Sequence, residues 1–211
     1  LLWILTIMAL ASMLIGNLLA LLQKRLKRLL AYSSVAHLGY LLVILVAGGP
    51  LAVEAAGYYL AAYFVTLVGA FGVITLLSSE ERDTDAVAEY RGLFWRHPWL
   101  AGILTLTMLS LAGIPVTMGF VAKFYVLATG VDRAQWLLVY GVIVTSAIGL
   151  YYYLRVIIVL FAAGEPAGLL PVARPWSGAL AVLGAALLLL ILGAYPGPLI
   201  DLLHTWIRPA V

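Results

Sequence analysis

Long runs of apolar residues, separated by short polar or glycine- and proline-containing connectors, make up most of the chain. A helix needs roughly 20 such residues to cross the hydrocarbon core of a bilayer. Runs of that length lie at about residues 2–22, 28–47, 52–77, 98–130, 134–162 and 176–207. The pattern predicts an all-α integral membrane protein with six transmembrane helices, in a single transmembrane domain over residues 1–211.

The fourth run is too long for one straight crossing. Its 33 residues would extend about 50 Å as a continuous helix, whereas the hydrocarbon core is about 30 Å thick. Gly113, Ile114 and Pro115 lie near its middle, and Pro115 removes a backbone donor and clashes with the preceding turn. Gly119 adds backbone freedom further on. We expect a discontinuous helix whose freed carbonyls face protein or a wet cavity.

Composition supports a membrane protein and excludes several kinds of site. The chain is 65% hydrophobic and 10% charged, whereas a soluble domain carries about 25% charged residues. It has no cysteine, which excludes thiolate metal sites and iron–sulfur clusters bound by this chain. No nucleotide, haem or flavin motif is present, and the basic residues form no nucleic-acid-binding patch. We expect no cofactor or metal here, and we expect the chain to be part of a longer protein, because it begins inside an apolar run.

The distribution of lysine and arginine predicts the orientation. With six crossings, the connectors on one side carry nine basic residues: Lys24, Arg25, Lys27, Arg28, Arg82, Arg91, Arg96, Arg155 and Arg174. The other side carries Arg133 and Arg208. Positive residues favour the cytoplasmic side. We therefore expect the long loop that contains Glu80, Glu81, Asp83, Asp85 and Glu89 in the cytoplasm, and both chain ends on the outer side of the membrane.

Lys123 is the strongest candidate for transport chemistry. It lies eight residues after Pro115, about 12 Å along a resumed helix. An ammonium group inside a bilayer costs several kcal/mol, so such residues usually face a polar interior. A desolvated lysine also gives up its proton readily. The alternative is a lysine that extends to the interface from near the helix end, since Gly130 is only seven residues away.

The second run places Ser33, His37 and Tyr40 on one helix face, at spacings of four and three residues. Histidine can relay protons near neutral pH, although a neutral histidine bonded to a neighbouring helix explains the same residue. Lys27 lies about 15 Å before His37 along the axis. It is a candidate for the start of a proton path or simply a positive anchor.

The third run repeats this spacing with Tyr59, Tyr63 and Thr66. Hydroxyl groups inside a bundle can hold water chains, but they also form ordinary hydrogen bonds between helices. Glu54, near the start of the run, is expected at the interface. No acidic residue lies near the middle of a run, so a carboxylate partner for Lys123 would belong to another part of the protein or to another subunit.

Four stretches resemble a known family in order and spacing. They are "KRLLAYSSVAHLGYLL", "YRGLFWRHP", "LSLAGIPVTMGFVAKFYVL" and "SAIGLYYYLRV". They are similar to subunit N of the proton-pumping NADH:quinone oxidoreductase, respiratory complex I, whose fold has fourteen transmembrane helices in two inverted repeats. The resemblance covers essentially this whole chain and only the C-terminal part of the family, so the chain would supply the last six helices.

The resemblance implies roles for individual residues. Lys123 matches the lysine on a broken helix in the distal half of the proton path, with Gly113 and Pro115 at the break. Lys27 and His37 match polar positions along the hydrophilic axis in the membrane plane. The N-terminal repeat, with its own lysines and glutamate, would belong to the missing half. NAD, FMN, iron–sulfur clusters and quinone would be bound by partner subunits of complex I, beside other antiporter-like subunits.

Other functions remain open from the sequence, including a quinone site formed by the tyrosines and His37, which their spacing does not require. A subunit of an Mrp-type cation/proton antiporter or of a membrane-bound hydrogenase would share the inverted repeat and the broken helix. A membrane scaffold without transport would use Lys123 as an anchor and the Gly113–Pro115 break as packing geometry.

The predicted orientation can be tested with a single cysteine, because this chain contributes no other thiol. We expect a cysteine at Ala86 in the acidic loop to react with a membrane-impermeant maleimide only from the cytoplasmic side. A cysteine at Asp132, in a connector predicted on the other side, serves as the control. Labelling of Ala86→Cys only from outside would overturn the topology.

Overall fold

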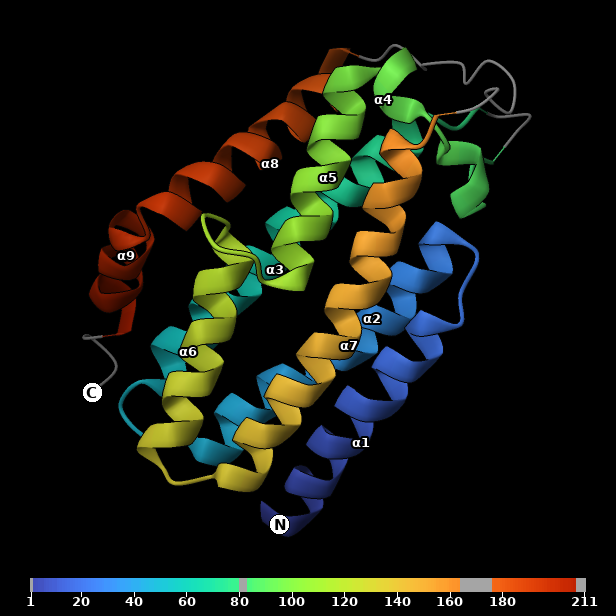
Figure 1. Ribbon diagram of the computed structural model, residues 1–211. Coiled ribbons are helices and arrows are strands. Elements are labelled where there is room, and N and C mark those ends of the chain that lie inside the picture. The colour runs from blue at the N-terminus through green and yellow to red at the C-terminus, as the bar shows by residue number, and fades with distance from the viewer. Residues whose placement is uncertain (1, 80–82, 164–175, 208–211) are drawn as a thin grey trace.

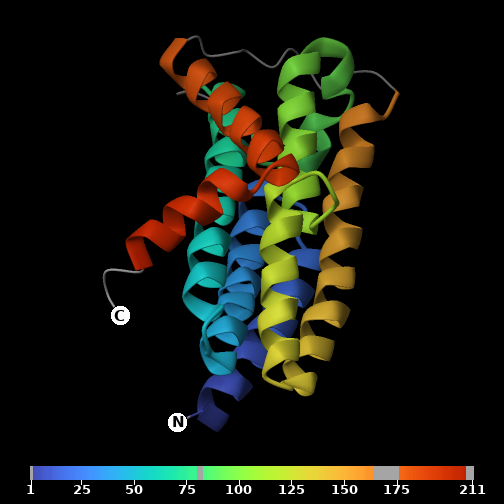
Figure 2. The same ribbon diagram turned by 90° about the vertical axis from the view of Figure 1, so that its left-hand side faces the viewer.

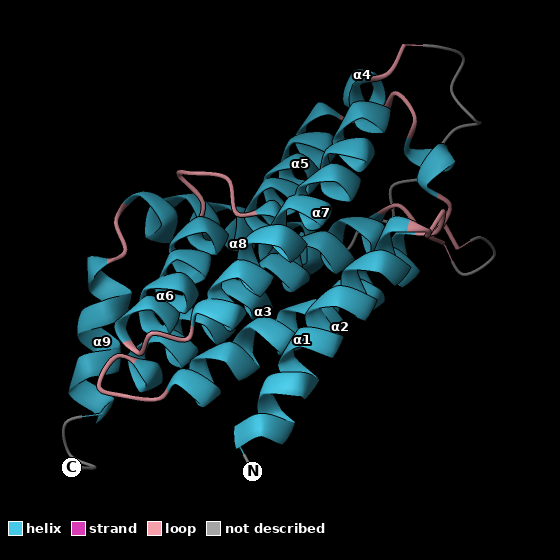
Figure 3. Cartoon of the chain, turned by 60° about the horizontal axis from the view of Figure 1, so that its bottom comes forward, coloured by secondary structure: helices cyan, strands magenta, loops and turns pink. Residues whose placement is uncertain are grey.

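The structure, a computed structural model, describes residues 2–79, 83–163 and 176–207. Its helices are α1 (Leu2–Leu21), α2 (Leu26–Ala47), α3 (Ala52–Leu76), a 3-10 turn (Val87–Tyr90), α4 (Leu93–Arg96), α5 (Pro98–Ala112), α6 (Met118–Asp132), α7 (Trp136–Phe161), α8 (Trp176–Ala194) and α9 (Gly197–Ile207). Figure 3 shows helices and loops throughout the described residues. The all-helical fold is therefore confirmed.

Five of the described helices are long and apolar enough to cross a membrane: α1, α2, α3, α7 and residues 177–194 of α8. The helices α1, α2, α3 and α7 run side by side, while α5 and α6 follow one another along the bundle with a lateral offset (Figure 1). Glycines bring α1 and α2 close together, because a Cβ on Gly16 would lie 2.6 Å from the Ala36 nitrogen. Small residues of this kind let membrane helices approach closely.

The chain leaves helical geometry between α5 and α6. Gly113 adopts the left-handed conformation, with φ of 83°, and its N–H donates to the Leu109 and Ser110 carbonyls. Glycine adopts this conformation at low cost. Thr117 then caps α6, because its side-chain oxygen accepts from the Phe120 N–H. Residues 113–117, called the break below, thus separate two helices of 15 residues each.

The expectation of one helix over 176–207 was wrong, because this segment divides into α8 and α9. Pro196 has no N–H, so the Leu192 carbonyl loses its helical donor. The Tyr58 hydroxyl donates to that carbonyl instead, at 2.6 Å. The direction of the chain changes sharply here, beside the break (Figure 2). Residues 192–197 are called the elbow below.

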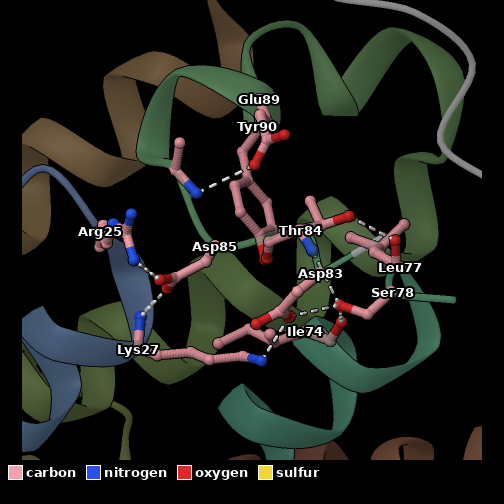
Figure 4. A network of polar contacts seen from close by, with 11 residues as sticks. Arg25, Lys27, Ile74, Leu77, Ser78, Asp83, Thr84, Asp85, Glu89 and Tyr90 are labelled. Carbon is pink, nitrogen blue, oxygen red and sulfur yellow. Dashed lines mark hydrogen bonds and ion pairs between the residues drawn. The ribbon is translucent and has the colours of Figure 1, made fainter. Parts of the chain in front are cut away.

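The polar loop is held to the start of α2 by a network of hydrogen bonds and ion pairs (Figure 4). Asp85 accepts from the backbone N–H of Lys27 at 2.9 Å, and its carbonyl accepts from Leu26. This carboxylate caps a helix whose own N-cap residue, Arg25, offers no capping side chain. A negative charge at a helix N-terminus is also favourable. Of the acidic residues expected in this loop, Glu80 and Glu81 lie outside the described residues, as do Arg82, Arg174 and Arg208.

Lys27 forms an ion pair with Asp83 in the same loop. Its hydrogen bond holds the pKa of the Asp83 carboxyl below its ordinary value. Because the folded pKa is lowered, this contact persists at neutral pH and is lost as the pH falls through the lowered pKa. At the other side of the loop, burial raises the pKa of the Tyr90 hydroxyl, which donates to the Thr84 carbonyl.

Replacing Asp85 by alanine should loosen the start of α2. A lost helix cap costs about 1 kcal/mol, and here the same side chain also holds the loop. We expect faster amide hydrogen exchange over residues 24–30 and 85–90 in Asp85→Ala, with a smaller effect in Asp85→Asn, which keeps an acceptor. The Asp83→Ala variant is the control, because it removes the ion pair and keeps the cap. Equal exchange in Asp85→Ala and the unaltered protein would contradict the cap.

Candidate functional site

Lys123 lies inside the bundle at the break. Its residue is 8% exposed, and its ammonium donates to the Ala112 carbonyl at 2.9 Å. Ala112 is the last residue of α5, where carbonyls lack helical donors and carry partial negative charge. The aromatic ring of Tyr40 lies 5.6 Å from the ammonium, within the range of a cation–π contact. The helix end thus supplies the polar partner that a buried cation requires.

The Lys123 stem also follows the glycine at the break. A Cβ on Gly113 would lie 2.7 Å from the Lys123 Cδ and 3.4 Å from its Nζ. Any larger residue there would displace the lysine. The absence of a side chain at Gly113 and its left-handed backbone therefore both allow the Lys123 ammonium to donate to the Ala112 carbonyl.

His37 on α2 is enclosed by aromatic residues. Its Nδ1 lies 2.7 Å from the Tyr59 hydroxyl on α3, and its Nε2 lies 3.4 Å from the Tyr153 hydroxyl on α7. Its ring stacks on Tyr63 with centroids 4.9 Å apart and meets Tyr40 edge-on. Both ring nitrogens thus have hydroxyl neighbours that can donate or accept, depending on the tautomer.

A cavity of about 10 Å³ joins these two residues, close to the smallest volume that holds one water molecule. Its lining residues come from α2, α3, α5 and α6. They are His37, Tyr59, Ala62, Tyr63, Thr66, Ser110, Leu111, Gly119, Ala122 and Lys123. The structure therefore brings together most of the residues predicted as a proton relay or as hydroxyls of a water chain.

Ser110 connects three helices beside this cavity. Its hydroxyl lies 3.0 Å from the Thr66 hydroxyl on α3 and accepts from the Gly119 N–H in the first turn of α6. A Cβ on Gly119 would lie only 1.9 Å from the Ser110 carbonyl oxygen. Gly119 is therefore required for the close approach of α6 to α5, in addition to the flexibility for which it was predicted.

A second buried polar group adjoins the site and was missed from the sequence. Asn17 on α1 donates to the Tyr40 hydroxyl at 3.2 Å and accepts from the Tyr152 hydroxyl at 2.9 Å. Tyr40 in turn donates to Thr145 on α7. Asn17 is the only asparagine of the chain, and an amide inside an apolar run was the signal that could have identified it.

Other predicted residues lie apart from the cavity. Lys27 is at the polar loop, where its side chain is partly exposed and paired with Asp83. Ser33 is buried, and its hydroxyl donates to the Leu30 carbonyl. Glu54 lies in the first turn of α3, where it accepts from the Tyr125 hydroxyl at 2.6 Å and lies 2.7 Å from the His204 Nε2 on α9. The structure thus places neither Lys27 nor Glu54 in contact with Lys123.

Comparison with known sequences identifies the family. The profile described as "NADH:quinone oxidoreductase/Mrp antiporter, TM" matches residues 1–149. The chain belongs to this family. The resemblance carried by the four sequence stretches is therefore confirmed, and with it the assignment as a multi-pass membrane protein.

Two curated relatives bear the same name, NADH-quinone oxidoreductase subunit N. The protein of Ectopseudomonas mendocina is 54% identical over 206 residues, which cover 95% of this chain and 42% of the relative. That of Chromohalobacter salexigens is 52% identical over 210 residues, covering 97% of this chain and 43% of the relative. The chain therefore spans less than half the length of these relatives.

Solved structures show the same fold. A chain of respiratory complex I from Thermus thermophilus with bound aureothin matches with a TM-score of 0.84 and 35% identity, over 94% of this chain and 44% of that one. A chain of the Mrp complex from a Dietzia species also gives 0.84, at 24% identity, over 97% of this chain and 46% of that one. At that identity the second match shows a shared fold only.

Gly119→Ala should destabilise the protein, because its methyl group would occupy the position of the Ser110 carbonyl oxygen. Overpacking of a tight site typically costs about 1–3 kcal/mol. We expect a lower melting temperature and less assembled protein in membranes. The matched control is Gly102→Ala on α5, where a Cβ meets nothing within 4 Å. Equal stability of the two variants would contradict the close contact at Gly119.

Proposed function

We propose that this chain is the C-terminal part of subunit N of a proton-pumping NADH:quinone oxidoreductase, and that it carries protons through Lys123 and His37. The support is 54% identity to a subunit N over 95% of the chain, together with the buried lysine at a helix break. Oxidation of NADH and reduction of quinone would take place in other subunits, which would bind the NAD, FMN, iron–sulfur clusters and quinone.

The environment of Lys123 carries this proposal. Burial away from water disfavours the charged ammonium, while the Ala112 carbonyl stabilises it by a hydrogen bond. Within the described residues no carboxylate pairs with Lys123. A cation balanced between these two opposing effects can release its proton when a nearby charge changes and bind it again when that charge returns.

The cavity between Lys123 and His37 supports the transfer of protons. A water molecule in this cavity would lie among the side chains of both residues and those of Tyr59, Tyr63 and Thr66. Hydroxyl groups and imidazole both donate and accept hydrogen bonds, so the proton can pass between them. Ser33 and Tyr40, on the same face of α2, would extend this polar path.

Lys27 would contribute at the cytoplasmic end of the path. There its ammonium pairs with Asp83, while its backbone N–H donates to Asp85, and the ammonium would collect protons from the aqueous phase. If it does so, Lys27→Gln should reduce the pumping rate without abolishing it.

The proposal assigns α5 and α6 together to one crossing, discontinuous at Gly113–Pro115, and α8 and α9 to another. The chain would then cross the membrane six times, as the C-terminal part of a fourteen-helix protein in the bacterial inner membrane. The acidic loop would face the cytoplasm, and both chain ends would face the periplasm. The N-terminal half of the same protein, lipid and other antiporter-like subunits of the complex would cover the apolar outer faces.

Replacing Lys123 by alanine should reduce proton pumping and the coupled NADH:quinone activity. Loss of a group that transfers protons typically costs at least about a hundredfold in its own step. Rates should be measured in vesicles reconstituted with the complex that contains the full-length protein. Lys123→Met keeps most of the volume and should have the same defect.

The control is Lys24→Ala, because Lys24 is an exposed lysine outside the bundle. Its pumping should equal that of the unaltered complex. Normal pumping by an assembled Lys123→Met complex would refute the role of Lys123.

A further inference from the structure

The elbow between α8 and α9 lies directly against the break. A Cβ on Gly193 would be 2.4 Å from the Thr117 carbonyl carbon, 2.5 Å from the Met118 nitrogen and 2.6 Å from the Val116 oxygen. These distances are much shorter than the 3.5–4.0 Å between atoms in normal contact. The backbone around the break therefore packs against the backbone of α8 at Gly193, with no space for a side chain between them. Figure 2 shows the end of α8 beside the loop between α5 and α6.

From these contacts, we propose that Gly193 and Tyr58 are positioning residues, which hold the α8–α9 elbow against the break and so keep Lys123 on the Ala112 carbonyl. This inference rests on the proton-relay function proposed for Lys123. It assigns a role in transport to a helix that contributes no side chain to the cavity between Lys123 and His37.

The break is packed on two sides. On one side the Lys123 stem lies against Gly113, where a Cβ would be 2.7 Å from the lysine Cδ. On the other side Gly193 meets residues 116–118. The break is only five residues long and tightly packed, so a displacement at residues 116–118 is transmitted to Gly113 and to the adjacent lysine. Close-packed interiors transmit strain in this way.

The elbow has its own attachment to α3. Tyr58 donates to the Leu192 carbonyl at 2.6 Å, which is the carbonyl that Pro196 leaves without a helical donor. Because Leu192 directly precedes Gly193, this bond fixes the residue that contacts the break. A carbonyl left without a donor is unfavourable in a membrane, so the bond favours a single geometry of the elbow.

A third contact links α9 to α3 and to α6, the helix that follows the break. Glu54 on α3 accepts from Tyr125 on α6 and lies 2.7 Å from His204 on α9. Nearby, a Cβ on Gly57 would be 2.8 Å from the Leu203 side chain. The two sides of the elbow are therefore anchored separately, α8 through Tyr58 and α9 through Glu54 and Gly57.

The test is Gly193→Ala in the complex that contains the full-length protein, reconstituted in vesicles. The methyl group would clash with the break, and α8 would have to move away by about 1 Å to restore normal contact distances. A misplacement of about that size can cost up to about a hundredfold. We expect pumping per assembled complex to fall at least about tenfold, with a lower ratio of protons pumped to NADH oxidised and a shifted pH dependence of pumping. The shift is decisive, because a purely structural defect would lower the amount of complex without moving its pH profile.

The matched control is Gly184→Ala on the same helix, where a Cβ meets nothing within 4 Å. It should pump like the unaltered complex with the same pH profile. Tyr58→Phe removes only the hydroxyl that holds Leu192, so we expect a smaller loss and a pH shift in the same direction.

An assembled Gly193→Ala complex with normal pumping and a normal pH profile would overturn the inference. If that variant does not assemble, normal behaviour of Tyr58→Phe would overturn it instead. The Lys123→Met variant separates the two proposals. If Lys123→Met fails to pump and Gly193→Ala pumps normally, only the role of the elbow is refuted. If Lys123→Met pumps normally, the relay through Lys123 is refuted.

Discussion

The hydrogen bond from the Lys123 ammonium to the Ala112 carbonyl is the interaction on which the site depends. A buried cation and an interrupted helix are each unfavourable in a membrane, but here each reduces the cost of the other. The interruption exposes carbonyls that lack donors, and the lysine has N–H groups that lack acceptors away from water. Their pairing at 2.9 Å explains why one segment of the chain contains both features.

Close backbone contacts at glycines maintain this pairing. Gly113 leaves space for the lysine stem, Gly119 lets α6 approach the Ser110 carbonyl, and Gly193 brings α8 against residues 116–118. At each of these positions the neighbouring atoms lie where a side chain would begin. Hydrogen bonds from the Gly119 N–H to Ser110 and from Tyr58 to the Leu192 carbonyl then fix the same helices. The break is consequently tightly packed in one defined conformation. This suits a site where a small change in position alters the environment of the Lys123 ammonium.

Much of the fold and part of the site followed from the sequence. Run lengths predicted the long helices, and the excess length of the fourth run together with Pro115 located the change in chain path. Spacing put His37 and Tyr40 on one face, and Tyr59, Tyr63 and Thr66 on another. The division of 176–207 into α8 and α9 was missed although Pro196 is visible in the sequence, because apolar residues predominate on both sides of Pro196. Asn17, Ser110 and Gly193 were missed because their roles consist of contacts between helices far apart in the chain.

The sequence by itself determined that the chain is a helical membrane protein and that Lys123 is an unusual charge near a helix breaker. These conclusions rest on composition, run length and local backbone chemistry, which require no knowledge of neighbours. Only the tertiary structure decided that the lysine meets the end of α5, that His37 shares its cavity and that Lys27 lies elsewhere with Asp83. Those facts depend on helix rotation and on distances between segments, which local sequence does not encode.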